Sequence, residues 1–304
     1  MPAQAQYWYF LIGGPIDDST GLVTNFYAYG QHCGEALANA LQAASEELGI
    51  SQPEATEATR LDILADFEEP EGLIQLTNLV FSGPNNYSYP LDSSEQDFIP
   101  PTGIIKAGED GEFDYELIKE NFIGYKTQGS DTYEFELVAD KSKLISTFIQ
   151  AIDFLPQAEK LEITIQGHWE GQSNELWVAD LAQSQLDAAS FLVENQSNIL
   201  ENGFVECTLY STKGETKLSL DEHKKIRHYT TDEAIFSNFG MQIMALGFEQ
   251  TTELYNLEYG FYHWHYRPID SLDALELRVL LLDAGFEFIK SWDEESSQQS
   301  SDLE

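Results

Sequence analysis

The chain has 304 residues, of which 53 are Asp or Glu and 15 are Lys or Arg, giving a formal net charge of −38. Such a charge repels nucleic acid and anionic membranes, and it attracts cationic proteins or metal ions. Hydrophobic residues make up 42% of the chain, which is enough for packed cores. No apolar run reaches the roughly 18 residues of a membrane span. We therefore expect neither nucleic acid nor a membrane as a partner.

Two features predict a cytoplasmic protein. Residues 1–14 lack the basic stretch and the small-residue cleavage site of a signal peptide. The two cysteines, Cys33 and Cys207, lie far apart and belong to no CxxC pair. We therefore expect two buried free thiols in a reducing compartment.

Residues 1–82 are predicted to form an N-terminal α+β domain of ββαββ order. An amphipathic helix that stops at Gly49 separates the second expected strand from the third. The expected strands are 7–12, 25–30, 61–65 and 73–81. Residues 83–112 are rich in Pro, Gly, Asn and Ser, and this composition predicts an irregular connection.

Residues 113–159 are expected to bridge the two halves of the chain. Within this segment, residues 132–139 alternate aromatic or aliphatic with acidic side chains, a pattern typical of a half-solvated strand. A short helix is predicted over residues 144–154, since Pro156 follows it.

Residues 160–292 are predicted to form a C-terminal α+β domain with antiparallel sheets. Two hairpins are expected, one from 161–167 and 175–179, the other from 204–210 and 215–220. From 222 to 292 the predicted order is βαββαβ, which is typical of a ferredoxin-like sandwich, with residues 248–254 and 259–267 as antiparallel neighbours. The fold class expected for the whole chain is therefore α+β, with repeated ββαββ or ferredoxin-like sandwiches. Residues 293–304 are expected to be a disordered acidic tail.

Four predicted helices share one pattern, an apolar stripe followed by glycine. The glycines are Gly49, Gly203, Gly247 and Gly285. Glycine suits the left-handed conformation that ends many helices, because a side chain would clash there. In the last helix the stripe comprises Leu272, Leu275, Val279 and Leu282, and we expect this face to pack on a sheet.

His263 and His265 form a His-x-His pair on a predicted strand. Alternate residues of a strand share a face, so the two imidazoles could bind one metal ion. A third ligand would come from His168, His223, His228 or a carboxylate. Arg267 on the same face disfavours a cation, and the alternatives are a solvated face or a surface that binds a partner.

A basic island interrupts the acidic sequence. It comprises Lys213, Lys217, Lys224, Lys225 and Arg227. Five cations within a molecule of this charge are too few to bind nucleic acid, because the overall field opposes its approach. We expect a solvated hairpin.

The function expected from the sequence is an acidic interaction module that neutralises a cationic protein, as inhibitors and immunity proteins do. The candidate contact residues are Asp17, Asp18, His168, Trp169 and Glu170. One alternative is a metal-dependent or small-ligand enzyme that uses His263 and His265. Another is a structural module whose charge reflects a saline habitat. The chain lacks the GxSxG, phosphate-loop and HExxH motifs, so an enzyme is disfavoured and no cofactor is expected.

Overall fold

The computed structural model describes most of the chain and divides it into two compact units. The described residues are 5–18, 20–62, 70, 72–90, 98–107, 118–169, 173–183, 186–257 and 262–293. The first unit comprises Met1–Asp97, Lys106–Asp114 and Gly260–His263. The second unit comprises Phe98–Ile105, Tyr115–Tyr259 and Trp264–Glu304. The predicted tail lies outside the described residues after Asp293.

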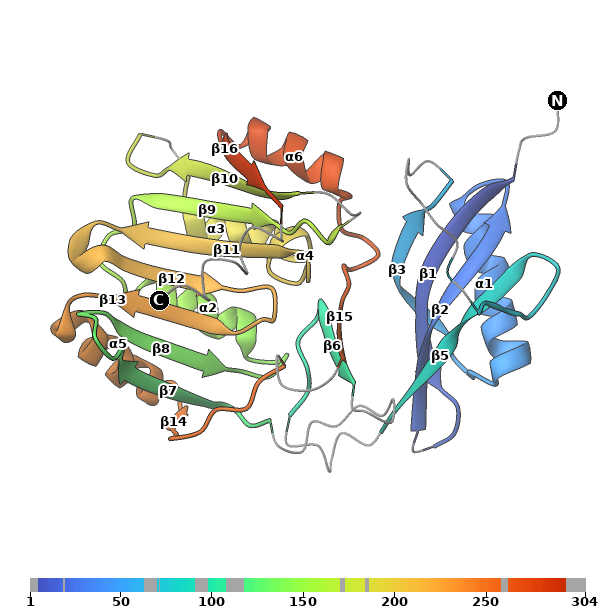
Figure 1. Ribbon diagram of the computed structural model, residues 1–304, viewed down its shortest axis with the longest axis horizontal. Coiled ribbons are helices and arrows are strands. Elements are labelled where there is room, and N and C mark those ends of the chain that lie inside the picture. The colour runs from blue at the N-terminus through green and yellow to red at the C-terminus, as the bar shows by residue number, and fades with distance from the viewer. Residues whose placement is uncertain are drawn as a thin grey trace. The chain divides into compact units, whose positions relative to one another are not determined.

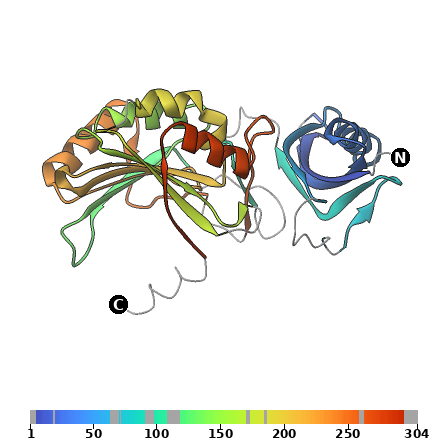
Figure 2. The same cartoon turned by 90° about the horizontal axis from the view of Figure 1, so that it is seen from above.

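The first unit is a five-stranded antiparallel sheet that curls around one helix (Figures 1 and 2). Its elements are β1 (Gln6–Pro15), β2 (Thr20–Gly30), α1 (Cys33–Leu48), β3 (Glu54–Arg60), β4 (Ile74–Gln75) and β5 (Val80–Pro90), with strand order β3-β1-β2-β5-β4. Strand β5 extends eight residues into the segment 83–112, so the prediction of an irregular connection is wrong for 83–90. Gly49 caps α1 in the left-handed conformation, with φ 72°, as the sequence predicts.

The second unit is built on a nine-stranded sheet with the order β14-β7-β8-β13-β12-β11-β9-β10-β16. Its strands are β7 (Asn121–Lys126), β8 (Tyr133–Val138), β9 (Lys160–Ile165), β10 (Asn174–Asp180), β11 (Val205–Ser211), β12 (Thr216–Leu220), β13 (Ile226–Thr230), β14 (Glu249–Gln250) and β16 (Glu287–Trp292). All neighbouring pairs are antiparallel except β14 with β7. The predicted hairpins β9–β10 and β11–β12 are confirmed. The segment 113–159 contributes β7, β8 and one helix to this unit.

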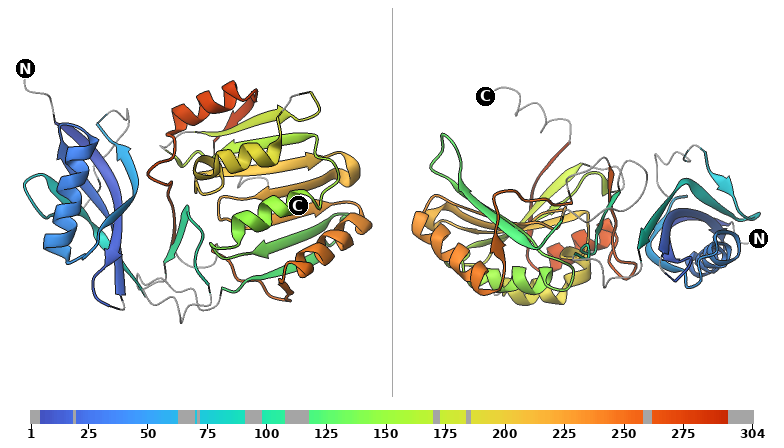
Figure 3. Two further views of the ribbon diagram at one scale, coloured as in Figure 1. Left: turned by 180° about the vertical axis from the view of Figure 1, so that it is seen from behind. Right: turned by 90° about the horizontal axis from the view of Figure 1, so that it is seen from below.

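The helices of the second unit cover one face of its sheet (Figure 3). They are α2 (Leu144–Ile152), α3 (Ala188–Glu194), α4 (Gln196–Ile199), α5 (Glu233–Ala245) and α6 (Ala274–Asp283). Under them lie alternate apolar residues of the strands, such as Leu161, Ile163 and Ile165 of β9. None of the helices in the described part of the chain has both the length and the hydropathy that a membrane crossing requires.

The α+β class is confirmed, but the ferredoxin-like arrangement is not. Strands β13, β14 and β16 are not neighbours, because β14 and β16 lie at opposite edges of the sheet. The expected pairing of 248–254 with 259–267 is also wrong. Instead β14 pairs with β7, and β15 (Tyr262–His265) pairs with β6 (Ile104–Ala107) in a separate two-stranded sheet. The order of elements follows from local periodicity, but the pairing depends on partners more than 100 residues away.

Helix α6 buries the face opposite to the predicted one. Its buried residues are Ala274, Leu277 and Leu281, whereas Leu275, Val279 and Leu282 of the predicted stripe are 66%, 51% and 57% exposed. Both faces of this helix are apolar and both have helical spacing. Periodicity therefore cannot choose between them.

The fully buried His228 on β13 makes folding sensitive to acid. Its ring stacks on Phe239 with the centroids 4.1 Å apart, and burial lowers the pKa of His228 to about 3. The unfolded chain takes up this proton near pH 6.5, so the stabilising contribution is complete above about pH 6.5 and is lost as the pH falls toward 3.

As the pH falls from about 6.5 to about 4.5, we expect the depressed pKa of His228 to lower the free energy of unfolding by about 2 kcal/mol. In His228→Phe, which keeps the aromatic stacking, urea unfolding at the two pH values should show a correspondingly smaller drop. Met241→Gln, at an exposed position without a titratable group, should retain the wild-type drop. An unchanged drop in His228→Phe would contradict this assignment.

Candidate functional site

Three segments of the second unit bring His168, Glu222 and His265 together. His168 lies in the turn between β9 and β10, Glu222 lies in the turn between β12 and β13, and His265 ends β15. One ligand atom from each residue lies within 4.8 Å of the other two. His223, next to Glu222, places its ring 5.2 Å from the ring of His265 in an edge-to-face contact.

A backbone carbonyl fixes the tautomer of His265. Its Nδ1 lies 2.6 Å from the carbonyl oxygen of Gly203. A carbonyl oxygen can only accept, so Nδ1 carries a proton, and in the neutral imidazole the lone pair is on Nε2. Histidines that bind metal ions commonly donate their second ring nitrogen to a carbonyl or carboxylate in this way.

Gly203 is required because backbones meet there. Its N–H donates to the carbonyl of Tyr266 at 2.9 Å, and the N–H of Tyr266 donates to the carbonyl of Gly103 at 2.9 Å. A Cβ at position 203 would lie 1.8 Å from the oxygen of Gly103. The sequence predicts Gly203 as a left-handed helix cap, which is wrong: its φ is not positive, and its role is to admit the backbones of Gly103 and Tyr266.

Aromatic packing supports His168. Its ring lies 5.4 Å from that of Phe204 and 4.7 Å from that of His265. Trp169 stacks on the same Phe204 at 5.5 Å and is only 4% exposed, so it anchors the turn in the core. His168 Nε2 lies 3.7 Å from Glu222 Oε2.

One carboxylate oxygen of Glu222, Oε2, is buried, although the side chain as a whole is 24% exposed and His168 Nε2 lies 3.7 Å from this oxygen. Within the described residues, its Oε2 has no solvent contact and accepts no hydrogen bond. Burial raises the pKa of Glu222, and the neighbouring His168 and His223 act in the opposite direction. A buried carboxylate oxygen that accepts no hydrogen bond is costly, and a cation beside it would remove that cost.

Further charged groups lie buried near Glu222. Lys224 is buried, its Nζ donates to the carbonyls of Asn202 at 2.7 Å and Val205 at 3.3 Å, and burial lowers its pKa to about 8. Glu206 has its pKa raised to about 7, first by burial and then by the negative charges of Asp221 and Glu222. The surroundings of Glu222 are therefore poorly solvated, which strengthens electrostatic interactions there.

The prediction of a solvated hairpin is confirmed for Lys213 and Lys217, which are exposed, but it is wrong for Lys224 and Lys225. Lys224 and Lys225 are each only 2% exposed. Lys225 Nζ forms an ion pair with Glu136 Oε2 at 2.8 Å, and Arg227 Nε lies 3.3 Å from Asp221 Oδ2. Strand alternation could not show this, because the partners come from β8 and from a turn.

The five residues expected to contact a partner do not form one site within either unit. Asp17 and Asp18 lie in the exposed β1–β2 turn of the first unit, where Asp17 Oδ1 accepts a hydrogen bond from the Thr20 N–H at 2.7 Å. His168 and Trp169 belong to the second unit, and Glu170 lies outside the described residues. Partner binding by these residues stays a prediction.

The structure describes the side chain of only one histidine of the His-x-His pair. His265 takes part in the cluster, whereas the side chain of His263 lies outside the described residues. Of the other ligands that the sequence suggests, His168 is in the cluster, His223 borders it and His228 is in the core under α5. Glu222 itself was not singled out. Its only sequence signal is its position beside His223, and the fold alone brings it to His168.

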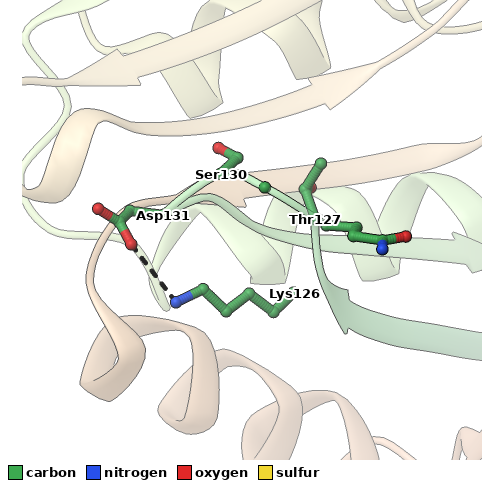
Figure 4. Close-up of a pocket in the computed structure, with 6 residues that line it drawn as sticks. Lys126, Thr127, Ser130 and Asp131 are labelled. Atoms are coloured by element: carbon green, nitrogen blue, oxygen red, sulfur yellow. Dashed lines mark hydrogen bonds and ion pairs between the residues drawn. The ribbon is translucent and has the colours of Figure 1, made fainter.

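Two open pockets elsewhere in the second unit are weaker candidates for a ligand site. A groove of about 580 Å³ at the β7–β8 turn is lined by residues 126–131, with an exposed ion pair between Lys126 and Asp131 at 3.5 Å (Figure 4). Another, of about 480 Å³, lies over the polar face of the sheet beside Tyr125 and the Lys225–Glu136 pair. In both, the charges named are already paired, so neither converges on a ligand as His168, Glu222 and His265 do.

Comparison of the chain with protein-family models, curated proteins and solved structures finds no match.

Because a side chain at position 203 would collide with backbone, we expect Gly203→Ala to lower the free energy of unfolding by about 2 kcal/mol, as overpacking does. Gly240→Ala is the matched control, since a Cβ there would meet nothing closer than 3.9 Å and alanine favours the helix. Urea unfolding of both variants measures the difference. Equal stability of Gly203→Ala and wild type would show that the close approach is not required.

Proposed function

We propose that this protein binds a divalent transition-metal ion, with Zn²⁺ the best fit, through His168, Glu222 and His265. The convergence of two imidazoles and one carboxylate within 4.8 Å carries the proposal. Zn²⁺ prefers nitrogen and carboxylate ligands at about 2.0–2.2 Å, and tetrahedral bonds of that length put neighbouring ligand atoms about 3.3 Å apart. Small rotations of side chains that lie in turns or at a strand end would close the present distances.

Two further observations support a metal ion over a plain ionic contact. The hydrogen bond from His265 Nδ1 to Gly203 leaves the Nε2 lone pair for a metal. The Oε2 of Glu222 is buried and accepts no hydrogen bond from the described residues. The carboxylate partly neutralises a divalent ion, and the strong negative charge of the molecule adds to its attraction.

Three protein ligands leave one tetrahedral position open. In proteins this arrangement is typical of zinc ions that bind water or substrate, whereas structural sites use four protein ligands. His223 borders the cluster, with its ring 5.2 Å from that of His265, and we infer that it is the candidate fourth ligand. The cluster therefore supports metal binding directly, and water activation by that metal is the chemistry it would allow.

Metal binding is tested by titrating the metal-free protein with Zn²⁺ in a calorimeter, with excess Mg²⁺ present to occupy surface carboxylates. We expect one site per chain, and at least about 100-fold weaker binding for His265→Ala and for Glu222→Gln, because removing a ligand costs at least as much as removing its support. His32→Asn is the control and should bind as wild type does. Affinity should fall as the solution is acidified, since histidine must be neutral to bind. Zn²⁺ binding that is absent, or equal in all four proteins, would refute the proposal.

A further inference from the structure

The outer face of α6 is apolar and exposed. Leu275, Val279 and Leu282 lie on it with exposures of 66%, 51% and 57%, while Ala274, Leu277 and Leu281 fill the opposite, buried face. A helix that is apolar on both sides is normally covered on both sides. Within the described residues, the second side of α6 lacks such a cover.

The spacing of the exposed residues suits another helix. From Leu275 to Val279 is four residues and from Val279 to Leu282 is three, which is the alternation of a seam between two packed helices. The ten residues of α6 span about 15 Å, or nearly three turns. Strand β16 follows α6 at the edge of the sheet (Figure 1).

The charges around this face are acidic. The exposed Glu276 and Asp283 border the stripe, and Asp273 and Glu287 lie at its two ends. The segment 273–290 has two basic residues, Arg278 and Lys290. Arg278 Nε donates to the carboxylate of Glu175 at 3.0–3.1 Å, and Lys290 Nζ lies 4.8 Å from the ring centroid of Trp292.

These charges decide against a second copy of the chain as the occupant. Two α6 helices packed antiparallel would place the acidic edge of each, Glu276 and Asp283, along that of the other. Each copy also carries a net charge of −38. Repulsion between the acidic edges and between the net charges of the two copies opposes association. Lysine or arginine at the flanking positions of a different helix would instead pair with these acids.

We propose that the outer face of α6 docks an amphipathic helix of another protein, whose apolar stripe is flanked by lysine or arginine. Leu275, Val279 and Leu282 would supply the apolar contact, and Glu276 and Asp283 would select the basic flanks. The contact would be the packing of one amphipathic helix against another, as in a coiled coil. The proposal is independent of the metal site, because it uses none of the residues of that cluster.

The probe is a labelled synthetic helix of about 20 residues with leucine at the seam positions and lysine at the flanking positions, long enough to hold a helix in water. A second peptide with glutamate at the flanking positions is the matched probe. Fluorescence anisotropy measures binding of each. We expect the lysine peptide to bind and the glutamate peptide not to bind.

The variant Val279→Gln with Leu282→Gln keeps the charge and the helical propensity, and we expect it to bind the lysine peptide at least about tenfold more weakly, a loss of about 1.4 kcal/mol. Met241→Gln with Met244→Gln changes two exposed apolar residues of α5 and should bind as wild type does. Circular dichroism checks that both variants are folded. Protection of α6 amides from hydrogen exchange in wild type with the peptide gives a test that needs no variant.

Three results would overturn the proposal. The first is unchanged binding of the lysine peptide by Val279→Gln with Leu282→Gln, which would mean attraction by the overall charge alone. The second is no binding of the lysine peptide, or equal binding of both peptides. The third is a wild-type dimer in sedimentation that this variant abolishes, which would make a second copy the occupant.

Discussion

The close contact of backbones at Gly203 is the constraint on which the candidate metal site depends. Here the strand end that carries His265 lies against the residues that precede β11. The N–H of Gly203 donates a hydrogen bond to the carbonyl of Tyr266, and the carbonyl of Gly203 accepts one from Nδ1 of His265. The space is too small for any Cβ. A residue without a side chain therefore sets both the position and the tautomer of a ligand that lies 62 positions away in the sequence.

Burial of charge is the second organising feature. Cations are scarce in this chain, and two of them, Lys224 and Lys225, are almost completely buried against carbonyl groups and Glu136. These internal pairings stabilise charges that would otherwise be costly inside the protein. Because Lys224 and Lys225 are buried, fewer positive charges remain on the surface to offset its carboxylates.

The sequence was most informative where the signal is local. Alternation along β8, the β9–β10 and β11–β12 hairpins and the left-handed glycine after α1 depend on neighbours within a few residues, and the structure confirms them. The ferredoxin-like order failed because periodicity shows where strands begin and end but not which strands pair. The prediction of which face of α6 is buried is wrong because the apolar residues of both faces have helical spacing.

By itself, the sequence determined the α+β class, the strong negative charge and the presence of a His-rich strand around His265. These follow from composition and from periods of two and about 3.6 residues. Only the tertiary structure decided that His265 meets His168 and Glu222, that Lys224 and Lys225 are buried, and that Leu275, Val279 and Leu282 face outward. The physical reason is common to all three: each depends on contacts between segments far apart in the chain, and no local pattern encodes which distant segment will fill the space.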